Sequence, residues 1–174
     1  VRGTHLTSGN VNVIANNESK NYAIAAGVVA STNQQSGAAN GNVAINKGVN
    51  STEAIVDEYK EFETNEGERG SINNATDINV TATDNTVLKA IAGGVTIGSG
   101  YVSIGGTVAY NEISGQRYIA SLSSNDITTL ENSTIDVKAI DTSDLLTIAA
   151  GGSVSTAQQS GVAQGSVAIA QISK

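Results

Sequence analysis

The sequence contains no cysteine, proline, methionine or tryptophan, and only one phenylalanine among its 174 residues. The lack of cysteine excludes a disulfide framework and a thiolate metal site, and it suits a chain that crosses membranes unfolded. Aromatic residues make up 3% of the chain and charged residues 14%, well below the content of an ordinary globular domain. The composition is therefore not that of a compact globule.

Basic clusters and long apolar runs are also missing. The formal net charge is −7, and the nine Lys and Arg residues are scattered singly along the chain. This pattern argues against binding to nucleic acid and to anionic membranes. The sequence contains no run of about 18 apolar residues, which a membrane-spanning helix would require. The first residues, 1–5, contain no apolar signal core, so we expect a removed signal or an internal piece of a longer chain.

Small and β-branched residues dominate what is present. Valine, isoleucine and alanine are regularly spaced, and the chain holds 19 glycines. In 78–82 and in 135–139 apolar and polar residues alternate with a period of two, which predicts strands with one wet face. Glycine and β-branched residues recur too densely for stable helices. The chain is therefore predicted to be all-β, with negligible helix.

An internal repeat covers most of the chain. Residues 21–46 align without a gap with residues 145–170, and 15 of these 26 positions are identical. The motif Gln-Gln-Ser-Gly occurs in both copies, at 34–37 and at 158–161. We therefore expect equivalent residues of the two copies to occupy equivalent structural positions.

A middle copy lies between these two. Segment 78–82 is the partner of 11–15 in the first copy and of 135–139 in the third. A single β-solenoid over 1–174 is predicted from this pattern. Its parts are leader or cloning residues 1–10 and the repeats 11–77, 78–134 and 135–174, the last of which stops in mid-repeat and suggests a longer parent protein.

Stacked coils explain both the repeat and the alternation. The repeat 78–134 divides evenly into three pieces of about 19 residues, which predicts about nine coils with strands laid on one another. A narrow solenoid favours valine, isoleucine, alanine and glycine inside. The expected buried residues are Val43, Ile45, Val80, Val108, Val137, Val167 and Ile169.

The recurring unit resembles a known family. It is carried by Gly41-Asn42-Val43-Ala44-Ile45-Asn46 with Asn50-Ser51-Thr52-Glu53-Ala54-Ile55, by Thr107–Ile113, and by Gly165–Ile169 followed by Ala170 in place of asparagine. These segments are similar to the repeats of filamentous-haemagglutinin-like adhesins, autotransporter passengers and leukotoxin-like large exoproteins. The resemblance implies a right-handed parallel β-helix, exported through an outer-membrane translocator to the bacterial surface.

The first repeat carries an acidic insertion around 57–70. It contains the only phenylalanine, and the residues expected to contact a partner there are Asp57, Glu58, Tyr59, Glu61, Phe62 and Glu63. A protruding recognition loop is one interpretation, because loops on rigid scaffolds often carry binding. A solvated excursion without a partner is the other. In either case deletion of 57–70 is expected to leave the fold intact.

Residues for catalysis are few. The only histidine, His5, precedes the repeats, and the glycine-rich stretches 93–106 and 150–152 lack the lysine of a phosphate-binding loop. The three arginines are Arg2, Arg69 and Arg117, and the carboxylates considered for a glycan-cleaving site are Asp136, Asp141 and Asp144. We predict no catalytic residues, no cofactor and no metal site.

The expected function is a structural and adhesive stalk segment of a large secreted bacterial surface protein. Its expected partner is a protein or glycan on a host or neighbouring cell, and the piece itself is expected to be monomeric. The stalk of a secreted toxin and a carbohydrate-active β-helix, a lyase or hydrolase, remain alternatives.

Far-ultraviolet circular dichroism tests the fold class. The spectrum should show strand with almost no helix, because the period-two segments and dense glycine disfavour helical turns. A helix content above about a fifth of the residues would contradict the prediction, since ordinary domains already contain about a third.

Overall fold

The computed structural model describes residues 5–57, 70–123 and 126–173, and the described residues form strands joined by turns without a helix. This confirms the expected all-β class. The strands are β1 (His5–Ser31), β2 (Gly37–Val56), β3 (Ser71–Gly98), β4 (Val102–Leu122), β5 (Asp126–Asp141), β6 (Asp144–Ser155) and β7 (Gly161–Ile172).

The chain divides into two compact units. Unit 1 comprises the described residues of Val1–Ser19, Asn50–Thr86 and Gln116–Ser143. Unit 2 comprises those of Lys20–Val49, Val87–Gly115 and Asp144–Lys174. Strands β1 to β4 each contribute residues to both units.

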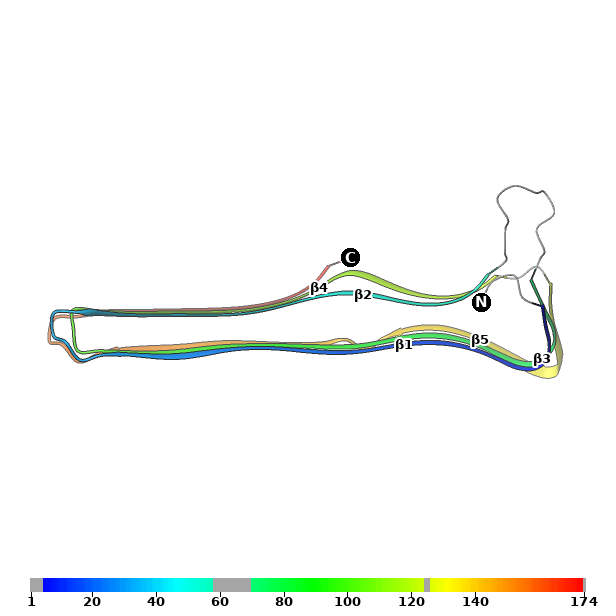
Figure 1. Cartoon of the computed structure of the whole chain (residues 1–174), viewed down its shortest axis with the longest axis horizontal. Helices are drawn as coiled ribbons and strands as arrows, with labels where there is room; N and C mark the ends of the chain where they lie inside the picture. Colours follow the sequence, from blue (N-terminus) through cyan, green and yellow to red (C-terminus); the bar gives the residue numbers. More distant parts are fainter. Residues whose placement is uncertain (1–4, 58–69, 124–125, 174) are drawn as a thin grey trace, which may run out of the picture. The chain divides into compact units, whose positions relative to one another are not determined.

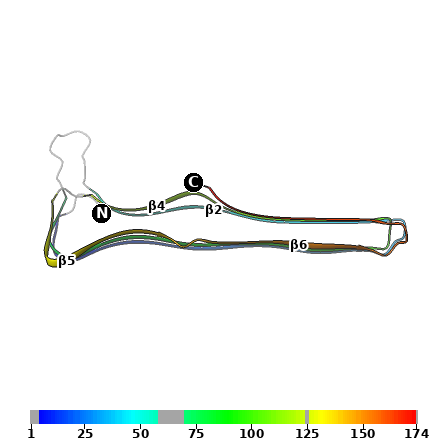
Figure 2. The ribbon, with the colours of Figure 1, turned by 180° about the vertical axis from the view of Figure 1, so that it is seen from behind.

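The strands form two parallel sheets. One has the order β1-β3-β5 and also contains β6, which pairs with β3, and the other has the order β2-β4-β7. In unit 2 these sheets form two layers, with β1, β3 and β6 in one layer and β2, β4 and β7 in the other (Figures 1 and 2). A strand of the first layer is followed in the chain by a turn and a strand of the second.

Equivalent residues of successive repeats lie side by side. Ile78 pairs with Ile135, and Ile91 pairs with Ile148. This confirms the alignment of 78–82 with 135–139. Each residue thus lies beside its counterpart one whole repeat later. A stack of about nine coils requires pairing between residues a third of a repeat apart, and the register does not show this shorter interval.

The interior of unit 1 follows the expected alternation. Ile78, Val80 and Ala82 of β3 are fully buried, and Val11 and Val13 of β1 pack against their cluster. The burial of Val80 is thus confirmed. Its counterpart in the next repeat, Val137, remains exposed because β5 lies at the edge of its sheet with only one neighbouring strand.

Small side chains fill part of the interior of unit 2, which also contains the fully buried Leu88 and Ile113. Ala44 and Ala109 of the second sheet form a buried cluster with Ala90 and Ala92 of the first. On strands with a period of two, burial of Ala44 and Ala109 places the residues on either side of them on the outer face.

Six of the seven residues expected in the interior are therefore exposed. Val80 alone is buried, and the exposed ones are Val43, Ile45, Val108, Val137, Val167 and Ile169. The prediction assigned the larger apolar residues of the second sheet to the inside. At these positions alanine and asparagine face inward, as Ala44 and Asn46 show, so the β-branched residues between them face outward.

Asparagine side chains cross the space between the two sheets of unit 2. The Asn46 amide donates to the Lys89 carbonyl oxygen at 2.8 Å and to Asn111 Oδ1 at 3.1 Å. The Asn111 amide donates to the Leu146 carbonyl oxygen at 2.6 Å and to Thr147 Oγ1 at 2.9 Å. Asn111 is completely buried, and these bonds satisfy its polar groups.

The assignment of faces can be tested with two adjacent residues. Ala109→Val adds two methyl groups to a filled inner row and should lower the free energy of unfolding by about 1–3 kcal/mol. Val108→Thr keeps the branched shape on the outer face and should change it by less than about 0.5 kcal/mol. Urea titration of both variants measures the difference, and equal effects would show that the assigned faces are wrong.

Candidate functional site

Most of the predicted recognition residues lie outside the described part of the chain. The gap between the described residues 57 and 70 contains Glu58, Tyr59, Glu61, Phe62 and Glu63. It covers most of the range 57–70. Asp57 is described and directly follows β2, where it is partly buried. The recognition loop therefore remains a prediction.

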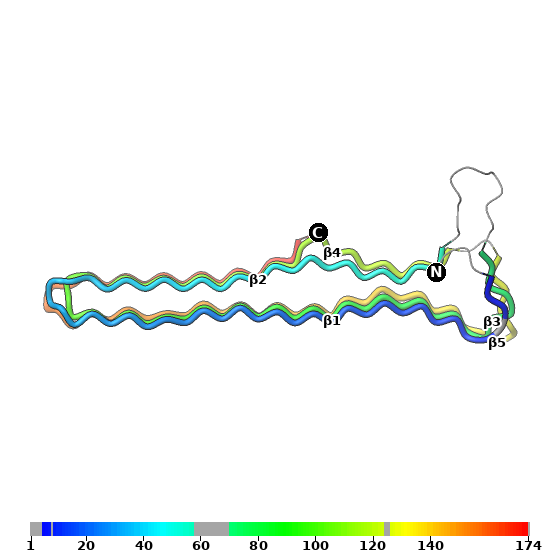
Figure 3. Tube along the Cα trace, viewed as in Figure 1, coloured from blue at the N-terminus to red at the C-terminus, as the bar shows by residue number. Residues whose placement is uncertain are grey.

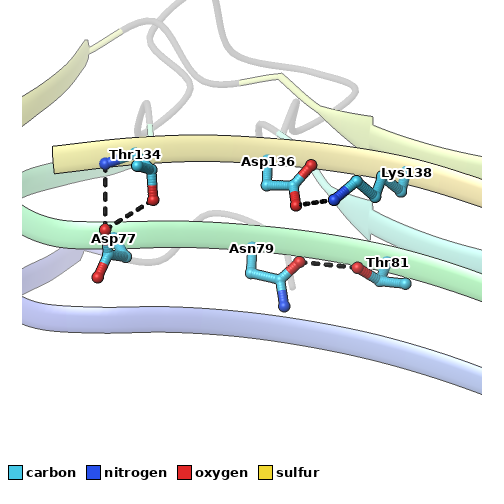
Figure 4. Close-up of polar contacts among 6 residues, drawn as sticks. All are labelled: Asp77, Asn79, Thr81, Thr134, Asp136 and Lys138. Carbon is cyan, nitrogen blue, oxygen red and sulfur yellow. Dashed lines mark hydrogen bonds and ion pairs between the residues drawn. The ribbon is translucent and has the colours of Figure 1, made fainter.

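The carboxylates considered for glycan cleavage in unit 1 have separate partners. Asp136 forms an ion pair with Lys138 two residues along β5, and Figure 4 shows both on the same face of the strand. Asp141 Oδ1 accepts hydrogen bonds from the Ser143 backbone N–H at 2.9 Å and from its hydroxyl at 2.6 Å. Asp144, the first residue of β6, is exposed in unit 2. These contacts are typical of a polar strand face and a turn.

A further carboxylate on this face binds across the strands. Asp77 Oδ1 accepts hydrogen bonds from the Thr134 hydroxyl at 2.7 Å and from the Thr134 backbone N–H at 3.1 Å (Figure 4). These two bonds, the hydroxyl first, lower the pKa of Asp77 below its usual 3.8. Asp77 and Thr134 are partners in the register, so this contact links the middle repeat to the third.

The histidine and the described arginine also have protein partners. His5 Nδ1 lies 2.8 Å from the Ser71 hydroxyl, and both residues belong to unit 1. Arg117 forms an ion pair with Glu53, with its Nε 2.9 Å from the Glu53 carboxylate. Both side chains thus have partners within unit 1.

Asp84, a carboxylate of unit 1 that was not among the predicted site residues, is completely buried. Asp84 accepts hydrogen bonds from the Asn17 amide at 2.7 Å, from the Thr52 and Ser143 hydroxyls at 3.3 Å, and from the Asn50 amide at 3.4 Å. Because Asp84 lies two residues beyond Ala82 on the same alternating strand, its inward direction was available from the sequence. It is closed to solvent, so its role is to hold the repeats together.

Tyr118 borders this network. Its hydroxyl is shielded from solvent and has no hydrogen bond of standard geometry. Burial raises the pKa of Tyr118, and the negative charges of Asp84 and Asp141 raise it further. Tyr118 is therefore neutral at physiological pH, so it places no second negative charge beside the buried carboxylate of Asp84.

The turns between the two sheets of unit 2 differ in length. Residues 32–36 join β1 to β2 and residues 156–160 join β6 to β7, whereas only residues 99–101 join β3 to β4. Since β3 and β4 lie in the middle of their sheets, the short turn lies between the two long turns. Figure 3 shows the short turn, in green, set back from the other two.

The set-back turn forms the floor of a pocket of about 510 Å³. Gln34 lines one side, Ser99 and Tyr101 line the floor, and 156–159 line the other side. The volume lies within the range of about 300–1,000 Å³ that is usual for small-molecule sites. All of these residues belong to unit 2.

The two long turns have the same internal hydrogen bond. The Ser36 hydroxyl donates to the Asn33 carbonyl oxygen at 2.7 Å, and the Ser160 hydroxyl donates to the Ala157 carbonyl oxygen at 3.2 Å. These serines belong to the repeated Gln-Gln-Ser-Gly motif, and their hydrogen bonds fix its backbone. Residues 34–37 and 158–161 thus occupy equivalent positions, as the repeat predicted.

The glutamines of this motif remain available for a ligand. Gln34, Gln158 and Gln159 are exposed, and their amides form no hydrogen bond within the described residues. Tyr101 exposes 57% of its surface at the floor of the pocket. The repeated motif is visible in the sequence, whereas Tyr101 does not stand out there. The clue to Tyr101 in the sequence is that its turn is two residues shorter than the two turns that contain the motif.

The outer face of unit 2 is rich in exposed apolar residues. On the second sheet Val43 lies in the first repeat, and Val108 pairs with Val167 of the third. On the first sheet Ile24 and Ile148 are exposed. Such extended apolar surface is unusual on a soluble monomer and typically marks an interaction site.

Comparison of the chain with protein-family models, with curated proteins and with solved structures finds no match. Among the described residues, no helix is long and apolar enough to cross a membrane. In the same part of the chain, no three His, Cys, Asp or Glu side chains come together as a metal site would require. The open turn pocket of unit 2 is therefore the candidate site that the geometry supports best.

The floor of the pocket depends on a glycine. A Cβ atom at Gly100 would lie 1.7 Å from the Ser36 carbonyl oxygen, a backbone atom that cannot move without distorting the long turn. Gly100→Ala should therefore lower the free energy of unfolding by about 1–3 kcal/mol. Gly106 is the matched control, because a Cβ there meets nothing within 4 Å.

Gly106→Ala should raise the free energy of unfolding by about 0.4–1 kcal/mol, through reduced freedom of the unfolded chain. Urea unfolding of both variants provides the comparison. A stabilising effect of Gly100→Ala would mean that the short turn does not lie against Ser36.

Proposed function

We propose that the chain is an adhesive stalk segment of a large secreted bacterial surface protein, folded as a right-handed parallel β-solenoid. The observation that supports this most is the register. Equivalent residues of successive repeats pair in parallel in both sheets, with Ile91 beside Ile148 in one and Val108 beside Val167 in the other. An array of this kind extends by adding repeats, because each repeat contacts only its neighbours.

The surface of unit 2 supports an adhesive role. Exposed apolar rows and an open polar pocket are both available to a partner outside the protein. The partner in this proposal is a protein or glycan on a host or neighbouring cell. Secretion through an outer-membrane translocator, attachment at the bacterial surface and a monomeric state of the segment complete the proposal, and nucleic acid is not a partner.

A bead-retention assay tests adhesion directly. Beads coated with the purified chain should be retained several-fold more than albumin-coated beads on monolayers of epithelial cells or on lawns of Gram-negative bacteria. Beads coated with the heat-unfolded chain control for nonspecific stickiness of the apolar residues. Retention equal to that of albumin on every surface would contradict the adhesive proposal.

The two alternatives give different results in parallel assays. A carbohydrate-active β-helix would release reducing ends from a polysaccharide, and Asp136→Asn or Asp144→Asn would abolish this release. The stalk of a toxin would leave beads unretained, although the full parent protein kills target cells. Either result would replace the adhesive proposal by that alternative.

A further inference from the structure

The turn pocket of unit 2 is built from parts that the adhesive proposal does not yet use. Two copies of the Gln-Gln-Ser-Gly turn flank a turn that is two residues shorter, so the depression follows from the lengths of the three turns. Backbone hydrogen bonds join the short turn to the chain on both sides of it. The Ser99 N–H donates to the Ser31 carbonyl oxygen at 2.9 Å, and the Gly161 N–H donates to the Tyr101 carbonyl oxygen at 2.8 Å.

The chemistry of the lining is polar and uncharged. Gln34, Gln158 and Gln159 supply amide groups, each of which can donate and accept hydrogen bonds. Thr156 and Ser99 supply hydroxyl groups, although the Ser99 hydroxyl already donates to Ser31. A site of this composition matches a ligand with many hydroxyl groups and no charge.

Tyr101 adds an aromatic surface to the floor. More than half of its surface is exposed, and its position in the pocket brings the ring within reach of a ligand. Aromatic rings offer a flat apolar face together with a polar edge, and they lose little conformational entropy on binding. The C–H face of a sugar ring has the same flat and weakly apolar character.

We propose that the turn pocket binds a short segment of a neutral oligosaccharide. The Tyr101 ring packs against the C–H face of one sugar, and the amides of Gln34, Gln158 and Gln159 form hydrogen bonds with its hydroxyl groups. This inference rests on the proposed function, since it assigns the glycan partner of the adhesive segment to specific residues.

Charge favours a neutral glycan over other ligands. No charged side chain lines the pocket, and the chain carries a net charge of −7, so anionic sugars and phosphates find no cationic partner there. A peptide could also bind glutamine amides through its main chain. The flat exposed ring of Tyr101 fits a sugar face better, and binding of peptides in place of glycans would overturn this inference.

The primary experiment uses a printed array of defined mono- to tetrasaccharides, both neutral and sialylated, probed with the labelled 174-residue chain. The expected result is binding to a subset of the neutral oligosaccharides. Tyr101→Ala should weaken binding by about tenfold or more, and the double variant Gln158→Ala/Gln159→Ala should do the same. Tyr22→Ala is the matched control, because Tyr22 is also 57% exposed but lies on β1, outside the pocket lining.

A second variant tests the origin of the pocket without removing any lining residue. Insertion of Gly-Ser between Gly100 and Tyr101 lengthens the middle turn to match its two neighbours. Filling of the depression should abolish binding to the array. Circular dichroism and urea unfolding must show that each variant retains the fold, so that loss of binding reports on the pocket.

The outcomes separate this inference from the adhesive proposal. Beads that adhere to cells equally well with Tyr101→Ala and with the insertion would overturn the glycan site while leaving adhesion intact. Array binding that depends on Tyr101, together with beads that are not retained on cells, would support the site and contradict adhesion. No binding to any glycan, or binding to an array of short peptides instead, would also overturn the inference.

Discussion

The two sheets of unit 2 lie close enough for side-chain amides of one sheet to reach backbone carbonyls of the other. Asn46 and Asn111 make these contacts, and the small Ala44 and Ala109 precede them by two residues on the same inward face. Separation of the sheets at these positions would leave the buried amides without partners, at a cost of about 1–3 kcal/mol for each. Because alanine and asparagine face inward here, the β-branched residues between them face outward, and this accounts for their exposure.

The sequence predicted the fold class and the pairing of repeats well, because both follow from local alternation and from identity at fixed intervals. It predicted the faces of the strands only in unit 1. There Val80 lies on a strand whose other face is polar, so hydrophobicity alone selects the inside. Around Val43 the alternative face carries alanine and asparagine. The choice between the faces depends on the hydrogen bonds that the inward asparagines make to the opposite sheet, which strand alternation does not reveal.

The site was less predictable than the fold. The Gln-Gln-Ser-Gly motif was visible as a repeated string, but its position beside Tyr101 follows only when the three turns are stacked in register. Asp84 was within reach of the sequence, since it continues the inward row of Val80 and Ala82. The segment from Asp57 to Glu63 has a distinctive composition, but composition alone does not predict a binding partner for it.

Unequal turns have a consequence for how such an array can evolve. The shorter middle turn makes the sequence separation of paired residues larger in the second sheet, where Val102 pairs with Gly161, than in the first, where Gly98 pairs with Ser155. Both sheets nevertheless keep their ladders in parallel register, so insertions and deletions at a turn are absorbed locally, without disturbing the strands on either side. Natural selection can then change the surface shape of one turn at a time while the sequences of the strands stay constant.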